Sequence, residues 1–167
     1  MGVGLLSLAR CTRLKDGMSS NKLLARLAHA DLQLLEPHLK AVELPVRMQL
    51  QARNKRVEQV YFLDSGVASI VANGRRAIEV GMIGREGMTG LSVLLGNGDR
   101  IPHETYMQIP GRGQRLSAEN LREAVAASAA LHQVLLGYVN TFLAQTTQRR
   151  LLPMVEVGSR SGWRAGS

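Results

Sequence analysis

The residues best suited to hold a small molecule are concentrated in one stretch, residues 80–105. Short apolar runs alternate there with glycines, which are Gly81, Gly84, Gly87, Gly90, Gly96 and Gly98. Glycine lets the backbone adopt positive φ angles and approach a bound group closely. Because strand-like segments precede and follow the stretch, we expect it to be the one irregular excursion from a β-barrel, where such folds often bind ligands. A glycine-punctuated loop without a ligand explains the same spacing.

Two segments of this stretch would line such a pocket. The candidate ligand-binding residues are Gly84, Glu86, Gly87, Met88, Thr89 and Gly90 in the first segment and His103, Glu104 and Thr105 in the second. A short helix is predicted to begin after Gly90, and helix N-termini present unpaired donors. We therefore expect the backbone N–H groups near Thr89 and Gly90 to receive an anionic or polar ligand.

His103 and Glu104 are also residue types that bind metals, as in barrel proteins of the cupin type. Those proteins use a His-x-His pair and a later Glu, and no second histidine lies two residues from His103. A metal site with two or three ligands is therefore not expected, and His103 is predicted to be a hydrogen-bonded pocket or loop residue. The sequence has no Ser–His–acid arrangement, no suitably spaced carboxylate pair and no phosphate-binding glycine motif. An enzyme is not predicted.

The elements that must position these residues begin with two short helices. Ser19–Asn21 can cap a helix that carries leucines on one face, and Asp31 can cap a second helix that Pro37 shapes or ends.

Apolar and polar residues then alternate with the period of strands. The expected strands cover 42–44, 48–50, 57–63, 67–72, 77–80, 105–109 and 114–116. Asn73-Gly74 is the strongest hairpin signal, since both residues tolerate the positive φ of a type I′ turn. Pro110–Gly113 is predicted to be another turn. Short strands separated by turn residues at even spacing favour a sandwich or jelly-roll barrel.

Two helices follow the strands. Ser117 is predicted to cap one that runs to about Ala127, and Ser128 a longer one that ends at Pro153.

The longer helix carries an apolar seam. Leu131, Leu135, Tyr138, Phe142 and Gln145 recur at alternating steps of four and three. This spacing is typical of a helix that packs on a partner helix. Gly137 in mid-helix costs about 1 kcal/mol relative to alanine, which favours close contact with a second chain. We expect a homodimer with Leu131, Leu135, Tyr138 and Phe142 at its interface; packing of the seam on its own barrel is the alternative.

Charge alone does not predict nucleic-acid binding. The net charge is +8, but residues 1–17 carry +2 and residues 149–167 carry +3, which leaves +3 for residues 18–148. No apolar run has the length of a membrane span, and the first residues lack the order of a signal peptide. The single cysteine, Cys11, excludes an internal disulfide. A cytoplasmic protein without a membrane partner is expected.

This order of elements resembles the sensor half of the Crp/Fnr family of bacterial transcription regulators over residues 21–148. The matching segments are NKLLARL at 21–27, PHL at 37–39, VYFLDSGVASIV at 60–71, IEVGMIGREGMTGL at 78–91 and PHETYMQIPG at 102–111. The resemblance implies a double-stranded β-helix (jelly-roll) of cyclic-nucleotide-binding-like type, mainly β with flanking helices. It also implies a long C-terminal dimerisation helix, with a winged helix-turn-helix after it.

Two departures limit what the resemblance carries over. Family members that bind cyclic AMP have a Gly-Glu pair and a later Arg-Ser/Thr-Ala; the Glu takes a ribose hydroxyl and the Arg neutralises the cyclic phosphate. Aligning that glycine on Gly90 puts Leu91 at the Glu and Ile101–His103 at the Arg triplet. Only a shifted register would bring in Arg100 or Glu86. Cyclic AMP in the usual mode is therefore not expected, and the effector stays unknown.

The second departure concerns the end of the chain. Nineteen residues follow Gln148, and they do not resemble the helix-turn-helix that the family carries there. We expect a truncated regulator that has lost family-level DNA binding. The expected organisation is an irregular leader at 1–18, a β-roll with flanking helices at 19–128, a dimerisation helix at 129–152 and a disordered tail at 153–167. The predicted function is an effector-binding sensor domain. A ligand-free dimeric interaction module is the alternative, and a cupin-like metalloenzyme is a third hypothesis.

Overall fold

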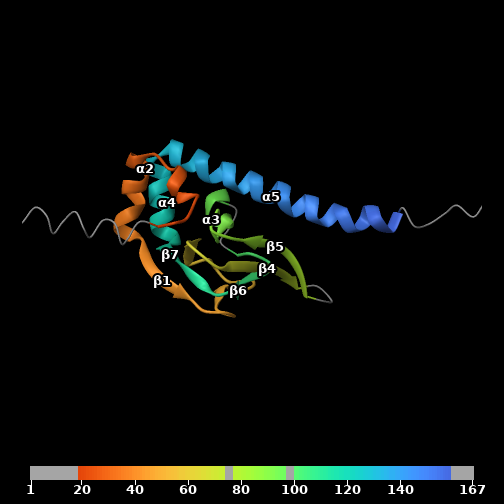
Figure 1. Cartoon of the computed structure of the whole chain (residues 1–167). Helices are drawn as coiled ribbons and strands as arrows, with labels where there is room; N and C mark the ends of the chain where they lie inside the picture. The colour runs from red at the N-terminus through yellow and green to blue at the C-terminus, as the bar shows by residue number, and fades with distance from the viewer. Residues whose placement is uncertain (1–18, 74–76, 97–99, 159–167) are drawn as a thin grey trace, which may run out of the picture.

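The computed structural model describes residues 19–73, 77–96 and 100–158 (Figure 1). The predictions for the leader 1–18, for the hairpin residues 74–76 and for the tail residues 159–167 concern residues outside these ranges. Within the described part, no helix combines the length and the apolar character needed to cross a membrane.

Two antiparallel sheets form the body of the described chain. One has the strand order β1-β7-β3 and the other the order β2-β6-β4-β5. The strands are β1 Lys40–Leu44, β2 Gln49–Gln51, β3 Gln59–Leu63, β4 Val67–Asn73, β5 Ala77–Ile83, β6 His103–Ile109 and β7 Gly111–Ser117. β1 pairs with β7 and β4 with β6, so strands far apart in sequence are neighbours. This pairing is typical of a jelly roll, and the predicted fold class, mainly β with flanking helices, is confirmed.

Strand β3 is buried on both of its faces. Tyr61 and Leu63 pack between the two sheets, in a cluster that includes Ile70 of β4 and Met107 of β6. Phe62 points the other way, into a cluster formed with the helices. Successive strand residues point to opposite faces, so a continuous apolar run is what a strand in this position needs.

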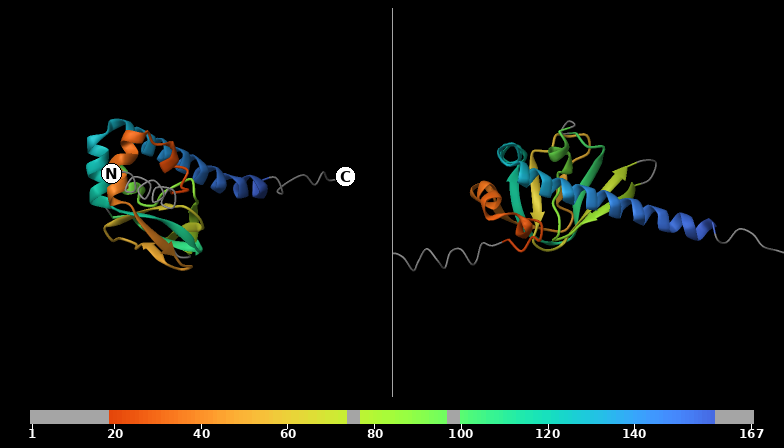
Figure 2. Two further views of the ribbon diagram at one scale, coloured as in Figure 1. Left: turned by 60° about the vertical axis from the view of Figure 1, so that its left-hand side comes forward. Right: turned by 90° about the horizontal axis from the view of Figure 1, so that it is seen from above.

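The helices gather on one side of the sheets (Figure 1). They are η1 Leu24–Arg26, α2 His29–Leu35, η2 Glu36–His38, α3 Leu91–Leu95, α4 Ala118–Ala127 and α5 Ala129–Gly158. Leucines from α2, α4 and α5 meet Phe62 and Leu116 of the sheet in one buried cluster. Figure 2 shows α5 crossing the body and extending beyond the sheets.

Of the caps predicted at Asp31, Ser117 and Ser128, the last two are confirmed and the first is wrong. The hydroxyl oxygen of Ser117 accepts the Asn120 N–H at 3.1 Å, and that of Ser128 accepts the Leu131 N–H at 3.1 Å. Asp31 is not a cap, because α2 begins at His29. Its carboxylate instead accepts a hydrogen bond from the Ser128 hydroxyl at 2.6 Å, which joins α2 to the start of α5.

Residues 111–113 form strand and not the predicted turn. β7 begins at Gly111 and pairs with β1 and β3 on its two sides. A Cβ on Gly111 would lie 2.2 Å from the Ser65 carbonyl oxygen, and one on Gly113 would lie 2.5 Å from that of Phe62. These glycines therefore allow neighbouring backbones to approach closely. From the local sequence alone, glycines needed for such an approach cannot be told from glycines needed for a turn.

Helix α5 continues past its predicted end. It runs without a break from Ala129 to Gly158 and so includes Pro153, where the sequence predicted a stop. Proline removes one helical hydrogen bond, but its φ near −65° is compatible with helix. The predicted boundary between a helix at 129–152 and an irregular segment from 153 is therefore wrong for residues 153–158.

The apolar seam of α5 packs on its own domain. Leu131 and Leu135 are fully buried in the single chain, and Phe142 is 8 % exposed. The Tyr138 hydroxyl donates to the Met88 carbonyl at 3.3 Å. Burial of large apolar side chains is strongly favourable, and the sheet and the other helices supply that burial. The predicted dimer interface at Leu131, Leu135, Tyr138 and Phe142 is therefore wrong, and the alternative of packing on the same barrel is confirmed.

Two glycines make room for the aromatic residues of this seam. A Cβ on Gly87 would lie 2.2 Å from the Tyr138 hydroxyl oxygen, and one on Gly81 would lie 2.7 Å from Cζ of Phe142. The two rings lie 6.2 Å apart between centroids. Close approach at these glycines seats α5 on β5 and on the segment that follows it.

Asn21 is a fully buried polar residue that joins η1 to the rest of the domain. Its amide nitrogen donates to the carbonyl oxygens of Leu63 at 2.7 Å and Gly87 at 2.8 Å. Its Oδ1 accepts the N–H groups of Leu23 and Leu24, both at 3.0 Å, which is the capping predicted from the sequence. One side chain therefore ties the first helical turn, the end of β3 and the glycine-rich segment together.

The Asn21→Ala variant should lower the free energy of unfolding by about 3 kcal/mol, because several buried backbone groups would lose their partner at once. Urea denaturation followed by circular dichroism measures the change. Ser20→Ala removes an exposed hydroxyl that donates to the Asp64 carbonyl, and as a control it should cost less than about 0.5 kcal/mol. Similar losses in the two variants would contradict the role assigned to Asn21.

Candidate functional site

A cavity of about 520 Å³ lies between the four-stranded sheet, α3 and α5; we call it the α5 cavity. Its polar lining residues are Gln51, Ser92, His103, Thr146 and Thr147. Ile70, Val80 and Ile83 from the sheet, Leu91 from α3, and Val139 and Phe142 from α5 contribute to its apolar wall. The volume falls within the range of about 300–1,000 Å³ that is common for small-molecule pockets.

The nine ligand-binding candidates from the sequence do not form one site. Gly90 and His103 line the α5 cavity, and Gly84 and Glu86 line a second cavity. The other candidates, which are Gly87, Met88, Thr89, Glu104 and Thr105, line neither.

Residues 87–89 belong to the core. Met88 is fully buried and forms an isolated bridge with Phe62 of β3. The Thr89 N–H donates to the Tyr61 carbonyl at 2.9 Å, and the Thr89 hydroxyl oxygen accepts the Tyr61 N–H at 3.0 Å. Because the fold already uses this N–H, the prediction that it receives an anionic ligand is wrong.

Thr105 contacts Gln51 of the cavity wall without lining the cavity itself, and Glu104 does not line the cavity either. Thr105 is fully buried, and its hydroxyl donates to Oε1 of Gln51 at 3.2 Å. Glu104 is partly buried and pairs with Val71 of β4. The prediction that these two residues contact a ligand is not supported by their positions, and Thr105 acts instead by orienting Gln51.

Two polar residues of the cavity wall escaped the sequence analysis. Gln51 is 8 % exposed, and its Nε2 has no hydrogen-bond partner; the buried hydroxyl of Ser92 in α3 has none either. Gln51 Nε2 lies beside Gly90, since a Cβ there would be 3.3 Å from it. A glutamine in the alternating segment Gln49–Gln51 reads as an ordinary strand residue, so the sequence offered no signal for its role.

The described lining of the α5 cavity carries no Asp, Glu, Lys or Arg. Burial lowers the pKa of His103, because the surroundings disfavour its charged form. The imidazole is therefore neutral at neutral pH. Burial also raises the pKa of Tyr138 on α5 and keeps its phenol protonated. The cavity thus presents an apolar and electrically neutral surface.

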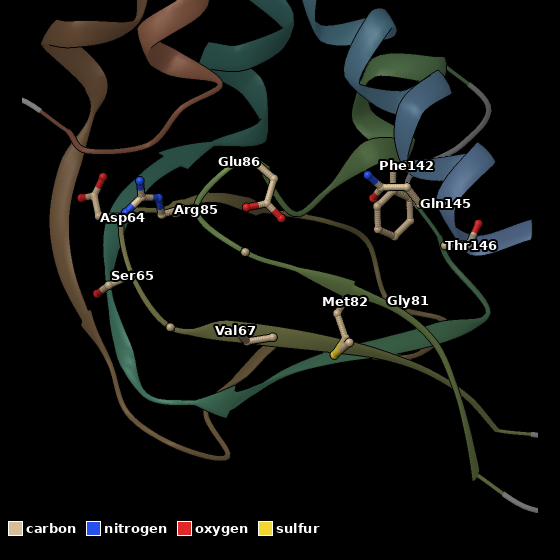
Figure 3. Close-up of a pocket in the computed structure, with 12 residues that line it drawn as sticks. Asp64, Ser65, Val67, Gly81, Met82, Arg85, Glu86, Phe142, Gln145 and Thr146 are labelled. Atoms are coloured by element: carbon tan, nitrogen blue, oxygen red, sulfur yellow. The ribbon is translucent and has the colours of Figure 1, made fainter. Parts of the chain in front are cut away.

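A second cavity of about 490 Å³ lies where the 64–67 turn, the end of β5 and α5 meet (Figure 3). Its lining is more polar, with Asp64, Arg85 and Glu86. The Asp64 carboxylate already accepts the Ser19 hydroxyl and the Asn21 N–H at 3.0 Å. The Glu86 carboxylate folds over Gly84, where a Cβ would lie 2.9 Å from one of its oxygens. The Asp64 carboxylate of this cavity therefore serves the local structure.

No group of three His, Cys, Asp or Glu side chains in the described ranges lies close enough together to hold a metal ion.

Helix α3 is bounded by two glycines in the left-handed conformation, and they provide a matched pair of substitutions. Gly90 has a φ of 80°, and a Cβ there would lie 2.4 Å from Cγ1 of Val60. Gly96 has a φ of 68°, and no described atom lies within 4 Å of such a Cβ. Gly96→Ala should therefore cost only the backbone strain of about 1–2 kcal/mol, whereas Gly90→Ala should cost clearly more. Urea denaturation measures the free energy of unfolding of both variants. Equal losses would mean that the Val60 side chain can move aside without cost.

Comparison with known proteins identifies the fold. No family model matches the chain, and a sequence search among curated proteins gives no match. Solved structures do match. The sensor domain of the transcriptional regulator DNR from Pseudomonas aeruginosa superposes with a TM-score of 0.59 at 16 % identity, over 74 % of this chain and 88 % of that chain. A cyclic nucleotide-binding domain from Methylobacillus flagellatus gives a TM-score of 0.63 at 13 % identity, over 81 % and 82 %.

The third comparison is with a longer regulator. The c-di-GMP responsive global regulator CLP of Xanthomonas campestris has a TM-score of 0.62 at 17 % identity. The match covers 74 % of this chain and 63 % of the CLP chain, so the present chain spans less than two thirds of that regulator. The chain therefore has the jelly-roll fold shared by cyclic nucleotide-binding domains and by the sensor domains of Crp/Fnr regulators.

Proposed function

We propose that this chain is a ligand-sensing domain of the kind found in Crp/Fnr regulators, with its effector in the α5 cavity. The observation that carries the proposal is the pair of buried polar groups without partners, Gln51 Nε2 and the Ser92 hydroxyl, on the wall of this cavity. Leaving such a group unsatisfied costs about 1–3 kcal/mol. Buried polar groups in proteins are nearly always paired, so a molecule that fills the cavity is expected to satisfy them.

The contacts of α5 are those expected of an element that passes on a signal of effector binding. Val139 and Phe142 of α5 form one wall of the cavity, opposite the sheet. Nearer the start of the helix, Nε2 of His132 lies 3.2 Å from the Leu94 carbonyl of α3. A ligand between these elements changes the contacts of α3 and of α5 at the same time. Loss of DNA binding stays a prediction from the sequence and is not part of this proposal.

The alternative of a ligand-free interaction module accounts less well for the cavity. Such a module gains nothing from an apolar space with two unpaired polar groups, because filling it with side chains would be more stable. A metalloenzyme of the cupin type has no supporting side-chain cluster in the described residues.

Ligand binding in the α5 cavity is testable with two tryptophan variants of one strand. Val80 and Met82 are both partly buried in β5, but Val80 lines the α5 cavity and Met82 lines the second cavity. A thermal-shift screen with cyclic nucleotides and uncharged aromatic compounds should find compounds that raise the melting temperature. The shift should disappear in Val80→Trp, which fills the α5 cavity, and persist in Met82→Trp. No shift with any compound, or the reverse pattern in the variants, would overturn the proposal.

We also propose that the chain forms a homodimer through the opposite face of α5. Ala130, Gly137 and Ala144 are exposed, and their spacing of seven residues places them on one side of the helix. Apart from the backbone of the adjoining turns of α5, no described atom lies within 4 Å of a Cβ on Gly137, so the single chain gives no reason for a glycine there. Small residues in such a row allow a second helix to approach closely.

Gly137→Ala distinguishes a free helix face from an interface. In a monomer the substitution should raise the free energy of unfolding by up to about 1 kcal/mol, because alanine favours helix and meets no neighbour. If a second helix packs against Gly137 in a dimer, the added methyl group should raise the dissociation constant of the dimer. Analytical ultracentrifugation over a concentration series measures that constant. Gln145→Ala, on the cavity-lining side of α5, is the control and should leave association unchanged. A chain that stays monomeric throughout would contradict the dimer.

A further inference from the structure

The charge of the α5 cavity restricts what it can bind. Among the described lining residues no side chain is cationic, and His103 is neutral because of its burial. A cyclic phosphate carries a negative charge, and moving it into an apolar space without a counter-charge costs several kcal/mol. Residues 97–99 lie outside the described ranges, so this applies to the sheet, α3 and α5. An anionic effector finds no charged partner on any of these three walls.

The polar groups of the cavity indicate one uncharged hydrogen-bonding group on the ligand. Oε1 of Gln51 is occupied by the Thr105 hydroxyl, which fixes the amide with Nε2 unpaired beside Gly90. An amide N–H is a donor only, so it requires an acceptor such as a carbonyl oxygen. The Ser92 hydroxyl on α3 can donate or accept and is also unpaired.

The entrance to the cavity is apolar as well. Leu95 of α3 is 49 % exposed and Leu143 of α5 is 54 % exposed, and both line the cavity. Large apolar side chains at a rim favour the entry of an apolar molecule and gain burial when one is bound. The wall formed by Ile70, Ile83 and Phe142 continues this character inward.

From these observations we infer that the α5 cavity binds an uncharged, mainly apolar small molecule through one hydrogen-bond acceptor that faces the Gln51 amide, and that it rejects cyclic nucleotides. This inference rests on the proposed function, because it specifies the ligand class of the same cavity. Gln51 selects the ligand by its acceptor, and the apolar wall supplies most of the affinity.

The test uses two molecules of nearly the same shape, benzophenone and 1,1-diphenylethylene, which differ only in that the carbonyl oxygen of the first is replaced by a =CH₂ group in the second. Their binding to the full chain is measured by displacement of the uncharged fluorescent probe N-phenyl-1-naphthylamine, with cyclic AMP and cyclic GMP as charged competitors. Benzophenone should bind about fivefold or more tightly than 1,1-diphenylethylene, which corresponds to one net hydrogen bond. The cyclic nucleotides should not displace the probe.

Two variants assign the preference to Gln51. Gln51→Leu removes the donor, so it should abolish the preference for benzophenone while 1,1-diphenylethylene still binds. Gln145→Leu, which makes the same change on the wall of the second cavity, should leave the preference intact. If Gln51→Leu fails to fold, Ser92→Ala and the wild-type comparison of the two compounds still decide the question.

The outcomes separate the inference from the proposed function. Equal affinity for the two compounds in the wild type, or tight binding of a cyclic nucleotide that Val80→Trp abolishes, would overturn the inference and leave the sensor function standing. No binding of the probe, of either compound or of either nucleotide would overturn both. A carbonyl preference that is lost only in Gln51→Leu supports both.

Discussion

The pairing of residues 87–89 with β3 determines where every part of the candidate site lies. Thr89 exchanges two hydrogen bonds with Tyr61, and Met88 bridges to Phe62. Because β3 is buried on both faces, this segment cannot shift without disturbing both core clusters. The constraint leaves Gly90 at the start of α3 and directs that helix across one end of the cavity. The backbone of residues 87–89 is therefore held by the fold, although the sequence had suggested that it was available to bind a ligand.

Helix α5 divides its surface between two roles. Its apolar side belongs to the domain, where Leu131 and Leu135 each contribute about 1.5–3 kcal/mol by burial. Its other side carries small and polar residues and leaves open space where a Cβ on Gly137 would lie. The domain can therefore fold without a second copy. An association across the small-residue side would be modest in strength and sensitive to how α5 is held.

Local signals were the part of the fold that the sequence predicted well. The caps at Ser117 and Ser128 are confirmed because they depend on residues three positions away. The turn expected at Pro110–Gly113 was wrong because glycines required for packing between strands resemble glycines required for a turn. The seam of α5 was recognised as apolar, but its partner was misassigned, since periodicity shows that a face is buried and not against what. Gln51 was missed because its significance depends on Thr105, which is 54 positions away in sequence.

The seating of α5 on two glycines affects how that helix can move. Tyr138 fits over Gly87 and Phe142 over Gly81, each closer than any added side-chain carbon would permit. Sliding the helix along its axis would drive both rings into the flanking backbone, whereas rocking it about this pair keeps both rings in place. The two aromatic residues therefore form a pivot for α5. The cavity lies beside this pivot, and the distal turns of the helix lie beyond it. A small tilt of α5 about this pair would give a larger displacement at the distal turns of the helix.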